Sequence, residues 1–454
     1  MDTTRNLSAG ADATQAIPAP GVDPARTVIG APAFDPGRTA MGAPGGLALQ
    51  LVPGNRYAMA TESGREHAVV QLQSSGMMAG RRLPLNLCLV IDRSGSMEGE
   101  PLDYVKRACG YVVDLLEPTD VLCLVTFEEQ VDVVMPARRV VNKQLIKEHI
   151  QRIQPGNTTN LYDGIVAGAS QVASVRSEAY VNRLIVLTDG EPTAGIKDFQ
   201  SIVGAVQEQK SRGISVTALG FGPEYNEELL AGIAKRSGGN YYYISRPDLI
   251  PEVFRKELDA LLTVTAKNLR LRLLLSRWVQ VRQIYGHLPT FGNRSVEVPL
   301  PDLERGMSLS AVVELELGRR PPGSYRVARV EVTYDDAVTG AMGQTLSDDL
   351  AFEFVTDRAL VAGGVNLQVQ RELEIAEASR NLEKTMMGIK TQQLGAGAAM
   401  AELQRTQMLL AQSGRAEQAH EVGQAIQGLR QGAGDVEKTL IGVSLELDQG
   451  KRKS

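Results

Sequence analysis

The fold of this chain is decided by the run Leu85-Asn86-Leu87-Cys88-Leu89-Val90-Ile91-Asp92-Arg93-Ser94-Gly95-Ser96-Met97. Its first seven residues are almost all apolar, as in a strand that is buried on both faces of a parallel sheet. The apolar run ends at Asp92, and Ser94 and Ser96 follow on alternate positions of one turn, where Gly95 lets the loop bend back tightly. The stretch therefore predicts a central strand that leads directly into a cluster of oxygen-bearing side chains.

Similar apolar strands are expected at residues 121–127, 184–188 and 214–219, with amphipathic helical stretches between them. Buried strands that alternate with helices indicate a mostly parallel sheet with helices on both faces. We assign this α/β domain to residues 84–262. In such sheets, ligands bind beyond the carboxyl ends of the strands, where the strand order reverses.

Two further stretches carry oxygen donors to the same edge. Thr188-Asp189-Gly190 follows a second strand, and the polar loop at residues 155–164 precedes a helix. A set of oxygen ligands without sulfur or imidazole favours Mg²⁺, with Mn²⁺ or Ca²⁺ as alternatives. Because at most two carboxylates contribute, the cation keeps positive charge and an open position, which would attract an acidic side chain of a partner.

These motifs resemble the metal-ion-dependent adhesion site of the von Willebrand factor type A (VWA) family, which has the pattern Asp-x-Ser-x-Ser, then Thr, then Asp. The threonine of the family lies in Gly-Gly-Thr-Asn, and this sequence has Gly156-Asn157-Thr158-Thr159-Asn160, in which Thr159 matches best and Thr158 is its neighbour. The resemblance implies a Rossmann-like domain that binds protein ligands through Mg²⁺ without catalysis. The implied metal ligands are Asp92, Ser94, Ser96, Thr159 and Asp189.

Other interpretations of the same residues remain open at this point. Asp92, Ser94 and Ser96 could be only the cap of a helix, and Asp189 before Gly190 could make only a turn. An alternative function is a Mg²⁺-dependent phosphoryl-transfer enzyme with Asp92 as nucleophile, although Ser94 stands where a second carboxylate would be needed. A VWA subunit of an AAA-type ATPase complex is a further alternative. We expect a non-enzymatic interaction module or scaffold.

The flanking segments predict two further parts. Residues 47–83 and 263–357 alternate with period two and contain Pro/Gly turns, so we expect both to contribute strands to one β-sandwich into which the α/β domain is inserted. Residues 358–454 have apolar residues at spacings of three and four, which predicts short helices that form a bundle or pack on the sandwich. The basic end Lys451-Arg452-Lys453 is expected to be solvated.

Residues 1–46 are rich in Ala, Gly and Pro and are expected to form a disordered tail. The tail repeats a motif, with Asp23-Pro24-Ala25-Arg26-Thr27 followed twelve residues later by Asp35-Pro36-Gly37-Arg38-Thr39. Thr27 and Thr39 are candidate phosphorylation sites for a Ser/Thr kinase, and phosphothreonine there would suit a forkhead-associated domain protein. A plain flexible tail is the alternative.

Composition excludes several classes of protein. The chain has 454 residues, a formal net charge of −5 and a pI near 5.7, which gives no footprint for nucleic acid. The three cysteines Cys88, Cys109 and Cys123 lie in apolar runs and form neither a disulfide framework nor a zinc pattern. We expect no membrane span and no secretion signal, and hence a cytoplasmic protein.

Overall fold

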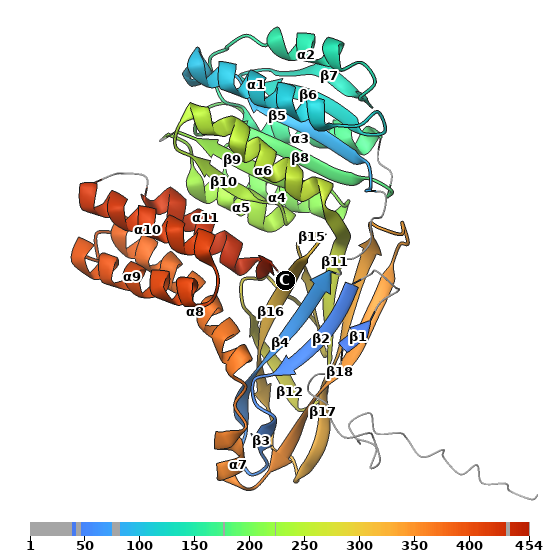
Figure 1. Ribbon diagram of the computed structural model, residues 1–454, viewed down its shortest axis with the longest axis vertical. Helices are drawn as coiled ribbons and strands as arrows, with labels where there is room; N and C mark the ends of the chain where they lie inside the picture. Colours follow the sequence, from blue (N-terminus) through green and yellow to red (C-terminus); the bar gives the residue numbers. More distant parts are fainter. Residues whose placement is uncertain are drawn as a thin grey trace, which may run out of the picture.

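The computed structural model describes residues 39–41, 47–74, 82–175, 178–222, 224–432 and 436–453. Figure 1 shows an α/β domain at the top, a β-sandwich below it, and a group of helices at the side that touches both. This arrangement confirms the predicted fold class. Among the described residues, no helix combines the length and the apolar character needed to cross a membrane.

The α/β domain is built on one twisted sheet with the strand order β10-β9-β8-β5-β6-β7. All neighbouring pairs are parallel except β6 and β7, so β7 is an antiparallel edge strand that the sequence analysis did not predict. The strand bounds are Leu85–Asp92 for β5, Val121–Phe127 for β6, Val131–Arg139 for β7, Val181–Thr188 for β8, Ser215–Phe221 for β9 and Tyr241–Ile244 for β10.

Helices cover both faces of this sheet because successive side chains of a strand point to opposite sides. Leu87 and Leu89 of β5 face α1, α2 and α6, whereas Cys88 and Val90 face α3, α4 and α5. The three cysteines are buried and reduced, as expected. The helices are α1 (Glu100–Leu115), α2 (Lys143–Gln151), α3 (Leu161–Ser174), α4 (Phe199–Ser211), α5 (Glu227–Ser237) and α6 (Ile250–Leu262).

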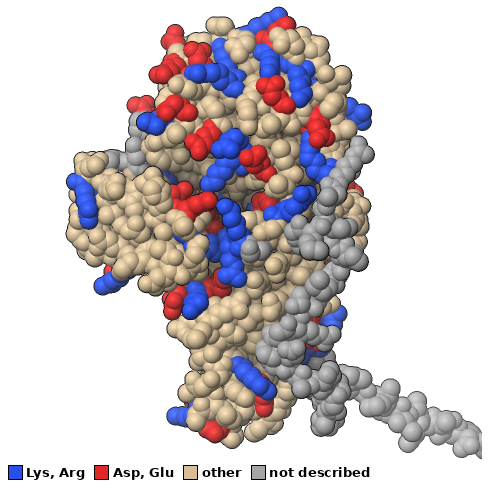
Figure 2. Space-filling view, in the orientation of Figure 1, with Lys and Arg blue, Asp and Glu red and all other residues tan. Residues whose placement is uncertain are grey.

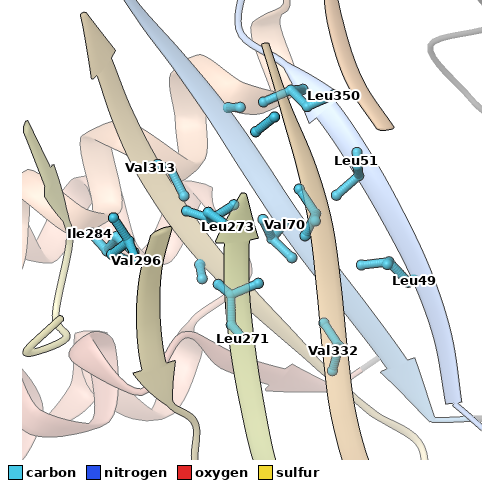
Figure 3. Close-up of a cluster of buried hydrophobic side chains, with 14 of the residues drawn as sticks. Leu49, Leu51, Val70, Leu271, Leu273, Ile284, Val296, Val313, Val332 and Leu350 are labelled. Carbon is cyan, nitrogen blue, oxygen red and sulfur yellow. The ribbon is translucent and has the colours of Figure 1, made fainter. Parts of the chain in front are cut away.

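The β-sandwich joins strands from both sides of the α/β domain. One sheet has the order β1-β2-β4-β16-β12 with β19 paired to β16, and the other has the order β13-β14-β11-β17-β18-β3 with β15 paired to β11. Side chains from both sheets point toward one another in the core, among them Leu49, Val70 and Leu271 (Figure 3). The α/β domain is thus inserted between β4 and β11, as the sequence indicated.

The strands of the sandwich have the following bounds: β1 (Thr39–Met41), β2 (Leu47–Pro53), β3 (Tyr57–Met59), β4 (Gly64–Ser74), β11 (Val264–Leu275), β12 (Val279–Ile284), β13 (Thr290–Gly292), β14 (Ser295–Pro299), β15 (Leu303–Glu304), β16 (Met307–Leu317), β17 (Gly323–Asp336), β18 (Gln344–Val355) and β19 (Lys451–Lys453).

The helical region consists of α7 (Arg358–Gly363), α8 (Leu367–Lys390), α9 (Ala396–Gln412), α10 (Ala416–Gln431) and α11 (Val436–Asp448). It is both a bundle and a packing layer. Val369 of α8 packs on the outer face of the sandwich against Val69 and Val312, while α8 to α11 share their own core. Helix α11 contacts α5 and β10, so the helical region also contacts the α/β domain.

Two segments differ from the sequence analysis. Thr39–Met41 were placed in the disordered tail, but they form β1 and pair with β2; Thr27 lies outside the described residues, and phosphorylation stays a prediction at both threonines. The basic end was expected to be solvated. Instead it forms β19, where Lys451 pairs with Glu304 at 2.6 Å and Arg452 pairs with Glu372 at 2.5 Å. These partners come from distant parts of the chain, so no local pattern indicated them.

Candidate metal centre

The predicted site lies at the carboxyl edge of the parallel sheet, where the strand order reverses. Strand β5 has β6 on one side and β8 on the other, so the ends of β5 and β8 flank the crevice in which such sheets bind ligands. Asp92 ends β5, and Asp189 follows the last residue of β8. The topology therefore brings two carboxylates that are 97 positions apart in the chain to one place.

Hydrogen bonds order the oxygen atoms at this edge. The Ser96 hydroxyl donates to Oδ1 of Asp189 at 2.8 Å, and the Ser94 hydroxyl lies 3.5 Å from the same oxygen. The carboxylate of Asp92 accepts from the backbone N–H of Ser94 at 2.8 Å and from the Thr188 hydroxyl at 2.5 Å. Four of the five predicted ligands thus form one connected cluster.

Thr159, the fifth predicted ligand, approaches from the loop before α3. Its Oγ1 lies 3.5 Å from the position that a Cβ on Gly190 would occupy, so its hydroxyl faces the residue after Asp189. The backbone of this loop is tied to the first motif, because Gly156 N–H donates to the Arg93 carbonyl at 2.6 Å. Neighbouring Thr158 also has a buried hydroxyl, which has no hydrogen-bond partner among the described residues.

A helix cap at the first motif or a simple turn at Asp189, the two local alternatives considered from the sequence, does not account for these contacts. Ser94 precedes a short 3₁₀ turn, η1 (Gly95–Met97), without a side-chain capping bond, and α1 is preceded by Gly99 rather than by a hydroxyl. The serine hydroxyls lie instead near the carboxylate of Asp189. That carboxylate accepts hydrogen bonds from across the crevice, which a turn alone would not require.

The carboxylates of Asp92 and Asp189 are buried, and burial disfavours their charged form. Burial raises the pKa of Asp92 to about 6, although hydrogen bonds from Thr188 and Ser94 oppose the rise. Burial also raises the pKa of Asp189, and the nearby charge of Glu224 adds to this. Neither carboxylate forms an ion pair with a basic side chain in the described part of the chain.

This donor set fits a hard divalent cation. Carboxylate and hydroxyl oxygens are the ligands that Mg²⁺ and Ca²⁺ prefer, and a bound cation would stabilise the charged form of both aspartates. When bound, it would act as a Lewis acid for an incoming oxygen. Two contributors were missed at the sequence level: Thr188 holds Asp92, and Glu224, on the β9–α5 loop, adds negative charge beside Asp189.

The fold and the site together define a class of Rossmann-like α/β proteins. Their open, mostly parallel sheet carries hydroxyls and carboxylates where the strand order reverses, and here this domain is inserted between strands of a β-sandwich. The family model of the von Willebrand factor type A domain matches residues 86–256. The uncharacterized protein sll0103 of Synechocystis sp. is 31% identical over 317 residues, which cover 65% of this chain and 74% of that protein. The chain therefore belongs to the VWA family.

Other relatives extend the comparison. The uncharacterized protein YfbK of Escherichia coli is 27% identical over 51% of this chain, and the match spans 42% of YfbK, less than half of its length. The solved structure of a von Willebrand factor type A protein from Catenulispora acidiphila has a TM-score of 0.70 and 18% identity. That likeness covers 86% of this chain and 91% of the other, so the two share the fold beyond the α/β domain.

Proposed function

We propose that the chain is a metal-dependent protein-interaction module, a scaffold that binds an acidic side chain of a partner through Mg²⁺. Asp92, Ser94, Ser96, Thr159 and Asp189 would hold the ion, some of them through water. The observation that carries the proposal is the hydrogen-bonded cluster of Ser94, Ser96 and Asp189. Ser94 and Ser96 belong to the turn that follows β5, and Asp189 follows β8, so the cluster joins the ends of two neighbouring strands.

The protein groups leave room for a ligand from outside. Ser96 is exposed, whereas Asp92, Ser94 and Asp189 are buried, so the site is closed toward the sheet and open toward solvent. Two carboxylates balance the formal charge of a divalent cation, but they supply only a few of the six or more oxygens that it usually binds. A carboxylate of a partner supplies both the missing oxygen and further negative charge. This makes Asp or Glu the expected anchor.

An apolar side chain beside the site adds to the contact surface. Ile196, on the loop between β8 and α4, is 41% exposed. The loop is fixed next to the metal ligands, because Thr193 and Ala194 donate backbone N–H groups to the Thr159 carbonyl at 3.0 and 3.2 Å. A partner is therefore expected to present an acidic residue next to an apolar one.

The experiment is affinity capture from a cell extract with the full chain immobilised, in Mg²⁺ and in EDTA. Partners that depend on the site should be retained in Mg²⁺ and lost in EDTA and in Ser96→Ala. Calorimetry should show that Ser96→Ala weakens Mg²⁺ binding. Ser174→Ala, an exposed serine at the end of α3, is the matched control and should behave like the natural chain. Equal Mg²⁺ affinity in Ser96→Ala and the natural chain would contradict the proposal.

A further inference from the structure

A second cavity lies at the opposite edge of the parallel sheet, between the α/β domain and the sandwich. It has a volume of about 820 Å³ and is lined by the ends of α4 and α5, by β11 and β14, and by the loop that follows β12. Asn182, near the start of β8, also lines it, whereas the candidate metal centre lies at the other end of that strand. The cavity is therefore distinct from the proposed metal site.

Basic side chains dominate the lining of this cavity. Figure 2 shows Lys and Arg side chains interspersed with Asp and Glu side chains where the α/β domain meets the sandwich and the helical region, whereas the lining of the cavity itself holds more cations than carboxylates. The carboxylates in the lining are Glu178, Glu297 and Asp335. The basic residues in the lining are Lys210, Arg212, Lys235, Arg236, Lys267 and Arg270. Cations thus outnumber carboxylates by two to one.

Only part of this positive charge is paired. Arg212 pairs with Glu208 at 2.5 Å and Lys235 pairs with Asp448 at 2.6 Å. Within the described ranges, the other cations of the lining form no ion pair; they are Lys210, Arg236, Lys267 and Arg270. Of the carboxylates, Glu297 pairs with Arg272 at 3.1 Å, and Asp335 accepts from the Asn268 amide at 2.7 Å.

Lys210 reaches into the cavity from the end of α4. Its ammonium group donates to the Ser215 hydroxyl at 3.3 Å, and burial lowers its pKa. Gly238, at a φ of 69°, lies beside it, and a Cβ there would come within 3.1 Å of Nζ. Lys210 is half-buried, and an ammonium group with one neutral hydrogen-bond partner leaves two of its donors for another acceptor.

Lys267 enters from the sandwich side at an irregularity of β11. The register of β11 against β17 shifts between Lys267 and Arg270, and Asn268 between them has a φ of 54°, in the left-handed region. Such bulges re-aim side chains. Lys267 is only 6% exposed, and its ammonium donates to the carbonyls of Glu178 and Tyr180 rather than to a carboxylate.

The wall behind these lysines holds further positive charge. Arg183, at the start of β8, pairs with Asp302 at 3.1 Å, while its Nε and Nη1 are enclosed without a hydrogen-bond partner among the described residues. Asp302 also interacts with Lys210. One buried carboxylate therefore faces several cations. Lys267 has the carboxylates of Asp335, Asp302 and Glu178 nearby. Cations still outnumber carboxylates in the lining, and because an excess of desolvated positive charge is costly, an anion in the cavity would lower the free energy of this region.

We propose that this cavity binds a small polyanion that carries phosphate groups. The cations converge from α4, α5 and β11 around a hollow, which suits a compact ligand with several charges rather than a flat protein surface. The guanidinium of Arg270 and the ammonium groups of Lys210 and Lys267 match phosphate oxygens. The volume accommodates a molecule up to the size of a nucleotide.

Calorimetry with inorganic pyrophosphate tests the proposal, with EDTA present so that no anion is held by a metal. The natural chain should bind one pyrophosphate saturably. The double variant Lys210→Met/Arg270→Gln should bind it roughly a hundredfold or more weakly, since it removes two charged hydrogen bonds and each contributes about tenfold or more to the affinity. The matched control Lys147→Met/Arg405→Gln removes the same charge from α2 and α9 and should bind normally.

Arg236→Gln, on the exposed end of α5, is a second variant that keeps the test usable if the double variant unfolds. Citrate serves as a carboxylate competitor and a short poly-glutamate as a peptide competitor. The absence of saturable pyrophosphate binding by the natural chain would overturn the proposal, as would unchanged affinity in the folded variants. Tighter binding of citrate or poly-glutamate than of pyrophosphate would overturn the assignment to phosphate. None of these outcomes bears on Mg²⁺ binding at the other edge.

Discussion

The hydroxyl of Thr188 donates a 2.5 Å hydrogen bond to Oδ2 of Asp92. Thr188 is the last residue of β8 and Asp92 is the last residue of β5, so the bond joins two neighbouring strands at the point where the chain leaves the sheet. Both side chains are fully buried. The bond fixes the orientation of the carboxylate and lowers its pKa against the larger effect of burial.

Replacing Thr188 with valine keeps the shape of the side chain and removes this donor. We expect Thr188→Val to lower the free energy of unfolding by about 1–3 kcal/mol, since a buried carboxylate oxygen loses its partner. The pKa of Asp92 should rise further, so protons should compete with Mg²⁺ up to a higher pH than in the natural chain. Denaturant unfolding and Mg²⁺ titrations at several pH values measure both effects. An unchanged pH dependence of Mg²⁺ binding would contradict the role given to Thr188.

A substitution at Ile196 should change partner binding without changing metal binding. We expect Ile196→Ser to weaken the metal-dependent partner contact roughly three- to tenfold, because an apolar contact of about 1 kcal/mol is lost. Mg²⁺ affinity should not change, since Ile196 offers no ligand. Surface plasmon resonance with a captured partner and calorimetry with Mg²⁺ give the two values. Val141→Ser, at a residue that is 74% exposed beyond β7 and away from the site, is the matched control.

Gly168 sets how closely α3 approaches the sheet. A Cβ there would lie 2.6 Å from Cγ2 of Val90 and 3.3 Å from Sγ of Cys88. We expect Gly168→Ala to destabilise the α/β domain by about 1–3 kcal/mol, as overpacking does. Gly204→Ala, at an exposed position of α4 where an added Cβ would have nothing within 4 Å, should instead be neutral or stabilising by up to about 1 kcal/mol. Denaturant unfolding compares them, and equal effects would argue against the close packing of α3.

His287 should make the stability of the protein sensitive to acid. Burial lowers its pKa from 6.5 to about 4, and its Nε2 is enclosed without a partner among the residues the structure describes. Above pH 6.5 the histidine is neutral in both the folded and the unfolded chain, so its burial does not reduce the free energy of unfolding there. As the pH falls from 6.5 toward 4, the unfolded chain binds a proton that the folded chain excludes, so up to about 3 kcal/mol is lost.

His287→Gln should remove this part of the pH dependence. The measurement is the midpoint of urea unfolding between pH 7 and pH 4, in buffers without phosphate so that the basic cavity holds no anion. The exposed His420→Gln is the control and should keep the slope of the natural chain. The same slope in His287→Gln would show that the ring is solvated in the folded protein.

Local patterns in the sequence determined the central strands and the candidate ligands. Leu87 and Leu89 lie in one core, and Cys88 and Val90 lie in the other. This alternation follows from the two-residue period of a strand, which can be recognised from a short stretch of sequence. Asp92 and Asp189 were predicted to meet because parallel strands end at the same edge of a sheet, and the structure brings both to that edge. The metal itself stays a prediction.

Contacts between distant segments were decided only by the tertiary structure. Strand β19 pairs with β16 across more than 140 residues, and the ion pair of Lys451 with Glu304 depends on that pairing. Lys210 and Lys267 share one cavity because α4 and a bulge of β11 meet at the junction of two domains. Sequence periodicity reports which face of an element is apolar but not which element will cover it, so the cation-rich cavity required the folded chain.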